Sequence, residues 1–135
     1  MTKRQLCSAS FVAIVAMAGL GHAGAKAEIN VFVDKVGGQF SGSLGTTRAS
    51  ADTSQYIGCN VLSLSGGAPQ INCGARTIAG GTNGTASCTV TSQTMADTLK
   101  TITNYSVLRV FYNTTTGICT QILVDNFSAY HPMSP

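Results

Sequence analysis

Four cysteines that follow the N-terminal segment are the feature that most constrains what this chain can fold into; the fifth, Cys7, belongs to that segment and is expected to be removed with it. An even set of cysteines in an exported chain usually pairs into disulfides, which stabilise domains too small to build a large core. A four-thiolate zinc site would instead need two close Cys-x-x-Cys pairs, and these cysteines are widely spaced. We therefore expect two disulfides, formed among Cys59, Cys73, Cys88 and Cys119.

The N-terminal segment has the three parts of a secretory signal peptide. It opens with the cationic sequence Met-Thr-Lys-Arg, continues with the apolar run Leu6–Leu20, and offers small residues for cleavage in Ala23–Ala27. The apolar run is shorter than the roughly 20 residues of a membrane-spanning helix. We expect residues 1–27 to be a signal peptide, cleaved after Ala27 or alternatively after Ala25, and no transmembrane anchor in the mature chain. The predicted location is secreted or periplasmic.

The rest of the chain, residues 28–135, has the length of a single domain. Removal of Lys3, Arg4 and Lys26 with the signal peptide leaves equal numbers of basic and acidic side chains. These charges are dispersed, whereas proteins that bind nucleic acid or anionic membranes cluster their lysines and arginines. We therefore expect no nucleic-acid partner.

Composition and periodicity indicate a β-rich fold. The domain is rich in Thr, Ser, Gly, Val and Ile and has no Trp, which favours strands and turns over helices. Apolar residues recur at every second position in Ile29–Asp34 and Ile57–Val61, as in half-buried strands. Two long strand-like runs, Asn104–Tyr112 and Ile118–Phe127, flank the polar segment Asn113–Gly117 and predict a hairpin.

Glycine-rich segments predict the remaining turns, and one other segment predicts a helix. We expect turns at Gly37–Gly38, Ser65–Pro69 and Gly80–Gly84, so that the strands follow one another as a meander. Apolar residues at helical spacing, behind a candidate cap at Ser92, predict a short helix over Gln93–Ile102.

The Gly/Ser/Thr-rich segment Gly37–Thr53 is expected to be a mobile loop, with Phe40 and Leu44 as the residues available to pin it. Together these patterns predict an all-β or mostly β fold. We expect a disulfide-stapled antiparallel sandwich or partly open barrel, with about six to seven strands and one short helix.

Strand register leaves two disulfide patterns open. A hairpin centred on Gly66 sets Cys59 opposite Cys73 and leaves Cys88 to pair with Cys119. A hairpin centred on Gly80–Gly81 sets Cys73 opposite Cys88, which would pair Cys59 with Cys119. Both registers place apolar residues beside the cysteines. We favour the first because it keeps the bulkier flanking pairs together.

Three stretches of the mature chain carry a resemblance. They are Gly-Ser-Leu-Gly-Thr-Thr-Arg at 42–48, Gln-Tyr-Ile-Gly-Cys at 55–59 and Cys-Thr-Gln-Ile-Leu-Val at 119–124. In these stretches the chain resembles small exported bacterial proteins with no assigned role. The resemblance implies export and a compact disulfide-bonded fold, and it implies no activity, ligand or site residue.

No catalytic, cofactor-binding or metal-binding constellation stands out in the sequence. The single histidine of the predicted mature chain, His131, lies near the chain end, where side chains are commonly exposed. Gly-x-Ser-x-Gly, calcium-loop and phosphate-loop motifs are absent from the sequence. We predict a protein that is not an enzyme and that uses no cofactor or metal.

Surface recognition is the remaining function, and its candidate residues are Arg109, Tyr112 and Tyr130. Because Phe111 and Tyr112 are neighbours in a strand, their side chains must point to opposite faces. We expect an exported module that binds a protein or glycan partner at the cell envelope or outside the cell. The alternatives are a structural subunit that assembles through an exposed edge strand, with Ile29–Val36 as the donor, and a small secreted enzyme inhibitor.

Overall fold

The computed structural model describes residues 29–63, 65–77 and 84–127. The predicted signal peptide lies outside these residues. In the described part, the chain forms seven strands and two short helices. They are β1 (Phe32–Asp34), β2 (Gln39–Ser43), α1 (Leu44–Ala49), β3 (Tyr56–Leu62), β4 (Gln70–Thr77), β5 (Gly84–Val90), α2 (Gln93–Leu99), β6 (Val107–Tyr112) and β7 (Cys119–Asp125).

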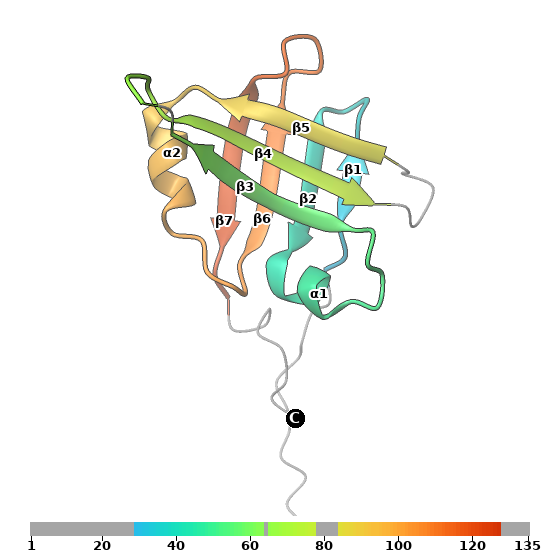
Figure 1. The fold of residues 1–135 in the computed structure, drawn as a ribbon. Coiled ribbons are helices and arrows are strands. Elements are labelled where there is room, and N and C mark those ends of the chain that lie inside the picture. The colour runs from blue at the N-terminus through green and yellow to red at the C-terminus, as the bar shows by residue number, and fades with distance from the viewer. Residues whose placement is uncertain (1–28, 64, 78–83, 128–135) are drawn as a thin grey trace, which may run out of the picture.

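The strands form two antiparallel sheets that pack face to face (Figure 1). The four-stranded sheet has the order β1-β2-β6-β7, and the three-stranded sheet has the order β3-β4-β5. The strands of one sheet cross those of the other at a steep angle, and the sheets do not close into a barrel. The predicted mostly β, disulfide-stapled antiparallel sandwich is confirmed.

The hydrophobic core lies between the two sheets and is built from alternate residues of each strand. Successive side chains of a strand point to opposite faces, so each strand contributes every second residue to the interior. The buried members are Val31, Val33, Phe40, Cys73, Ala75, Ala86, Cys88, Val90, Leu108, Val110, Cys119 and Ile122.

Residues 37–53 do not form the predicted loop, because they contain β2 and α1. The ring of Phe40 is fully buried in the core. The Ser43 hydroxyl accepts a hydrogen bond from the Thr46 amide at 3.2 Å and so caps α1. Helix α1 was not predicted from the sequence, because a six-residue helix is too short to show a helical period.

The predicted meander is confirmed for β3, β4 and β5, but it is wrong for the whole chain, because β2 pairs with β6 rather than with β3. Phe40 lies opposite Val110, and Gly42 lies opposite Leu108. After β2 the chain leaves the four-stranded sheet through α1, builds the three-stranded sheet, and then returns. Glycine-rich turns mark where strands end, but they carry no information on which distant strands pair.

The hairpin between β6 and β7 is confirmed. The Asn113 side-chain oxygen accepts hydrogen bonds from the amides of Thr115 and Thr116, at 2.9 and 3.0 Å. Gly117 completes the turn with a φ of 66°, which is the left-handed region that favours glycine.

The two disulfides are Cys59–Cys73 and Cys88–Cys119. This is the pairing that we favoured from register. The register that sets Cys59 opposite Cys73 and the register that sets Cys73 opposite Cys88 are both present, because β4 is the middle strand and has a partner on each side. Cys59, Cys73 and Cys88 therefore form one row across the three-stranded sheet, and Cys73 bonds to Cys59.

The second disulfide joins β5 to β7 and so fastens the two sheets together. Beside it, the Thr89 amide donates a hydrogen bond to the Gly117 carbonyl at 2.9 Å. The Cys88–Cys119 disulfide depends on a bulge in β7. At this bulge, Thr120 is an extra residue in β7 that has no partner in β6. Gln121 points outward, so in a regular strand the side chain two residues earlier, Cys119, would point outward as well. The bulge instead directs the Cys119 side chain into the interior.

The predicted donor segment Ile29–Val36 forms part of its own sheet. It contains β1, which pairs with β2, and its side chains Val31 and Val33 are 5% and 1% exposed. Donating this segment to another copy would withdraw both valines from the core.

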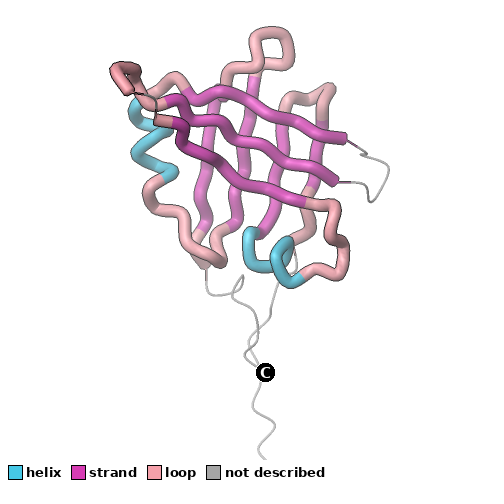
Figure 2. The backbone as a smooth tube through the Cα atoms, in the orientation of Figure 1, coloured by secondary structure: helices cyan, strands magenta, loops and turns pink. Residues whose placement is uncertain are grey.

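Helix α2 covers one side of the sandwich, whereas α1 lies at one end (Figure 2). Helix α2 begins after Ser92 as predicted, but the Ser92 side chain makes no capping hydrogen bond. The helix ends at Leu99, and tighter i to i+3 hydrogen bonds continue the chain to Ile102. Met95, Leu99 and Ile102 are half-buried against the core, as their spacing predicted.

Candidate functional site

The outer face of the three-stranded sheet carries three rows of side chains that run across its strands. The rows are Tyr56, Arg76 and Thr85; Gly58, Gly74 and Ser87; and Asn60, Asn72 and Thr89. Because the middle row has almost no side chains, the face is hollowed between the outer two. This hollow, which we call the glycine trough, has a volume of about 370 Å³ and is lined by Tyr56, Gly58, Asn60, Asn72, Gly74 and Ser87.

Gly58 forms the floor of the trough, and the fold does not require a glycine there. Its φ is not positive, and a Cβ atom added to it would meet no atom within 4 Å. By contrast, Gly38 has a φ of 65°, and a Cβ there would collide with the Tyr112 carbonyl oxygen. A glycine inside a strand costs about 0.5–1 kcal/mol relative to alanine. The glycine at position 58 therefore leaves the floor of the trough open and lowers the stability of the fold.

Tyr56 forms one wall of the trough. Its side chain is 48% exposed, and its Cε2 atom lies 4.0 Å from the position that a Cβ on Gly74 would take. The ring therefore leans over Gly74 and leaves the floor above Gly58 open. An aromatic ring held in this way presents apolar area with little loss of side-chain freedom on binding.

Asn72 forms the opposite wall, and a neighbour fixes its orientation. The Thr89 hydroxyl donates a hydrogen bond to the Asn72 side-chain oxygen at 2.9 Å. Among the described residues, none accepts a hydrogen bond from the Asn72 amide nitrogen, which carries two N–H donors. Among the described residues that line the trough, none carries a charged side chain. Its polar side-chain groups are amides, one aliphatic hydroxyl and one phenol, and Ile57, Cys59 and Cys73 complete the lining.

The structure places the predicted residues Arg109 and Tyr112 on opposite faces of the four-stranded sheet. Tyr112 packs inward against Phe40, with ring centroids 5.9 Å apart. Burial, and next the charge of Asp34, raises the pKa of the Tyr112 hydroxyl above its ordinary value of 10. Arg109 points outward, so the two residues do not share a surface, and Tyr130 lies outside the described residues.

Arg109 instead lines a smaller hollow on the outer face of the four-stranded sheet. This hollow has a volume of about 290 Å³, and Phe32 and Phe111 also line it. The Arg109 side chain forms an ion pair with Asp125 at 3.3 Å. Its charge is therefore partly neutralised, and because the Arg109 side chain is half exposed, the pair adds little to stability.

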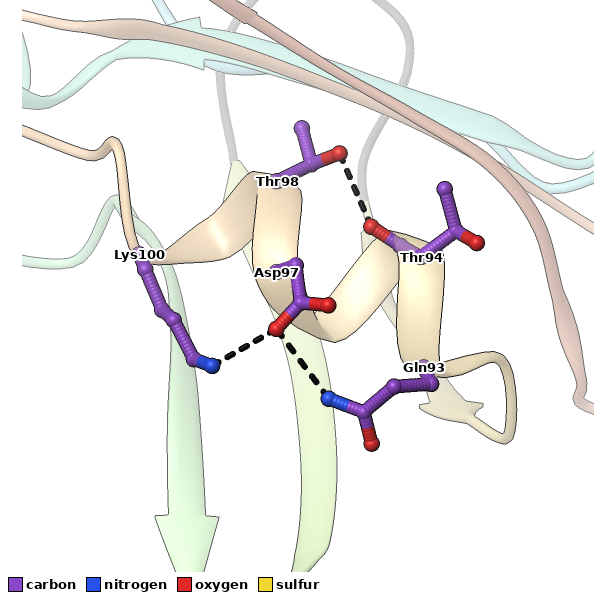
Figure 3. Close-up of polar contacts among 5 residues, drawn as sticks. All are labelled: Gln93, Thr94, Asp97, Thr98 and Lys100. Atoms are coloured by element: carbon purple, nitrogen blue, oxygen red, sulfur yellow. Dashed lines mark hydrogen bonds and ion pairs between the residues drawn. The ribbon is translucent and has the colours of Figure 1, made fainter.

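A third hollow, of about 550 Å³, lies between the end of the three-stranded sheet and α2. Its walls are mainly apolar, but Gln93 and Lys100 stand at its rim. Both are held by Asp97, which accepts hydrogen bonds from Lys100 Nζ at 2.6 Å and from Gln93 Nε2 at 3.1 Å (Figure 3).

These contacts on Asp97 give a prediction for its titration. The hydrogen bond from Lys100, and next that from Gln93, holds the pKa of the Asp97 carboxyl below its ordinary value of 3.8. Replacing Lys100→Met should raise this pKa, which NMR titration of the carboxyl carbon measures, whereas Lys35→Met should leave it unchanged. An Asp97 pKa that does not respond to Lys100→Met would contradict the interaction.

The same shift fixes the sign of its effect on stability. Because the folded-state pKa of Asp97 is lowered, the stabilisation is present at pH values above the unfolded pKa. It is lost as the pH falls through the folded-state pKa.

Comparisons with known proteins leave the site to be interpreted from its own geometry. No family model, no curated protein and no solved structure matches the chain. In residues 29–63, 65–77 and 84–127, no group of three histidine, cysteine or acidic side chains could hold a metal ion. None of the helices in those ranges is long and apolar enough to cross a membrane.

The glycine trough was not predicted from the sequence, although a signal for it was present. Gly58 directly precedes Cys59, and Gly74 directly follows Cys73. The register that sets the two cysteines opposite each other in antiparallel strands also sets these glycines opposite each other. Two facing glycines inside strands mark a place where a ligand or another backbone approaches closely.

Proposed function

We propose that the protein is an exported, non-enzymatic binding module whose glycine trough recognises a protein or glycan at the cell envelope or outside the cell. The observation that carries the proposal is Gly58. Its missing side chain weakens β3 and relieves no clash or backbone strain, so the open floor is best explained by a ligand that occupies it.

Two further features support this function. The two disulfides are compatible with an oxidising location such as the space outside the cytoplasm. No histidine, free thiol or carboxylate is found among the described residues that line the trough, and these are the groups that most often act as general acids, bases and nucleophiles.

The substitution Gly58→Val tests the proposal, because stability and binding should change in opposite directions. Valine fits the open space and favours a strand, so we expect the free energy of unfolding to rise by about 0.5–1 kcal/mol. The same side chain fills the trough, so retention of the protein on a cell-envelope fraction should fall at least about tenfold.

Thr85→Val is the matched control, since it adds valine to the same outer face away from the trough. It should leave retention unchanged. Stability is read from urea unfolding, and retention from co-sedimentation of the protein, produced through a secretory route, with the envelope fraction. Equal retention of wild type and Gly58→Val, or no retention of wild type, would refute the proposal.

A further inference from the structure

We infer that the glycine trough binds a neutral sugar ring of an oligosaccharide, an inference that rests on the proposed function and narrows its ligand to a glycan. A pyranose ring has an apolar C–H face and a rim of hydroxyl groups. The trough offers a counterpart to each of these parts.

The apolar face of a sugar is matched by Tyr56. Its half-exposed ring stands beside a floor that has no side chain at Gly58, so a flat ligand can reach the backbone of β3 while its C–H face contacts the ring. A folded protein partner would more typically meet a broad apolar patch with several aromatic anchors. Tyr56 is the single aromatic side chain among the described residues that line the trough.

The hydroxyl rim of a sugar is matched by the amides on the opposite wall. Asn72 is already oriented by the Thr89 hydroxyl, and its two N–H donors are directed away from that bond. Asn60 lies next to it in the same row and is exposed, and Ser87 adds a hydroxyl to the floor. The described residues that line the trough carry no charged side chain, whereas Arg76 lies opposite Tyr56 in the flanking row. A neutral sugar can therefore find its hydrogen-bonding partners within the trough without an ionic contact.

The first experiment identifies the chemical class of the ligand on the envelope fraction. Periodate cleaves the vicinal diols of sugars, whereas protease removes proteins. We expect periodate treatment of the fraction to abolish retention of the wild-type protein and protease treatment to spare it. Loss after protease alone would overturn the sugar inference and leave the proposed function standing, whereas absence of retention before either treatment would refute the proposed function.

The second experiment tests the trough residues with an array of neutral hexose oligosaccharides whose rings carry vicinal diols, followed by NMR titration of the best binder. Asn72→Asp keeps the oxygen that accepts the Thr89 hydrogen bond and removes both amide donors. We expect it to weaken binding at least about tenfold. Gln70→Glu makes the same change on the same outer face beyond the trough, and it should leave affinity unchanged.

The aromatic wall has its own pair of variants. Tyr56→Phe keeps the ring and should bind within about threefold of wild type, whereas Tyr56→Ala should lose at least about tenfold in affinity. Amide shifts at Gly58 and Gly74 should report the contact in wild type. Equal affinities for wild type, Asn72→Asp and Tyr56→Ala, or a failure of every neutral oligosaccharide to bind, would overturn the inference.

Discussion

Replacing both Cys88 and Cys119 by alanine is expected to lower the free energy of unfolding by about 3.7 kcal/mol, the loop-closure value for a bond that spans 31 positions. The bond joins β5 to β7, and both of its cysteines are almost fully buried. Its loss frees one sheet from the other at the edge where they meet. Urea unfolding of the variant and wild type, both purified without reductant, measures the difference.

Cys59→Ala with Cys73→Ala is the matched control for this prediction. That bond spans only 14 positions and links two strands that are already paired within one sheet. The same relation gives a loss of about 3 kcal/mol. A larger loss from this pair than from Cys88 and Cys119 would contradict the role assigned to the inter-sheet bond.

Replacing Phe40→Ala is expected to lower the free energy of unfolding by about 3–5 kcal/mol, which is typical for removing a buried aromatic ring from a core. Phe40 is the largest fully buried side chain of the described residues and packs against Tyr112. Val36→Ala provides the comparison, because Val36 is 94% exposed and should change stability by less than about 0.5 kcal/mol.

The Phe40 prediction is checked by urea and thermal unfolding of both variants. If Phe40→Ala is no more destabilising than Val36→Ala, residues 37–53 do not contribute the core strand that the structure assigns to them. A variant too unstable to purify would need a milder replacement, and Phe40→Leu then serves, with an expected loss smaller than that for alanine.

The sequence predicts well those elements whose signal is local. Alternating apolar residues located β1, β3 and the long hairpin of β6 and β7, because each strand has one face in the core. The cysteine registers were predicted for the same reason, since shifting a strand by one residue would expose its apolar side chains.

The elements that escaped prediction depend on contacts between distant segments. The pairing of β2 with β6 joins residues about 70 positions apart. Nothing in the sequence of β2 indicates which strand it pairs with. Small residues such as Gly42 and Ser43 were interpreted as loop composition, yet both are buried, and Ser43 caps α1. Small polar residues fit a loop and a closely packed strand equally well.

The candidate surface was only partly predictable for a related reason. Because successive side chains of a strand point to opposite faces, Phe111 and Tyr112 were correctly predicted to lie on opposite faces. The same rule places Arg109 on the face opposite to Tyr112. The glycine trough was missed because a binding surface formed by absent side chains produces no motif. It becomes visible only when the register brings the small residues of three strands into one row.

Both disulfides join cysteines that follow one another along the described chain, and this order bears on how the native bonds form. A chain that enters an oxidising space with its N-terminus first presents Cys59 and Cys73 before the other two thiols appear. Cys73 is then already engaged when Cys88, its neighbour on the other side of the row, arrives. Cys88 must wait for Cys119, and the native bonds can close in the order of translocation without exchange by an isomerase.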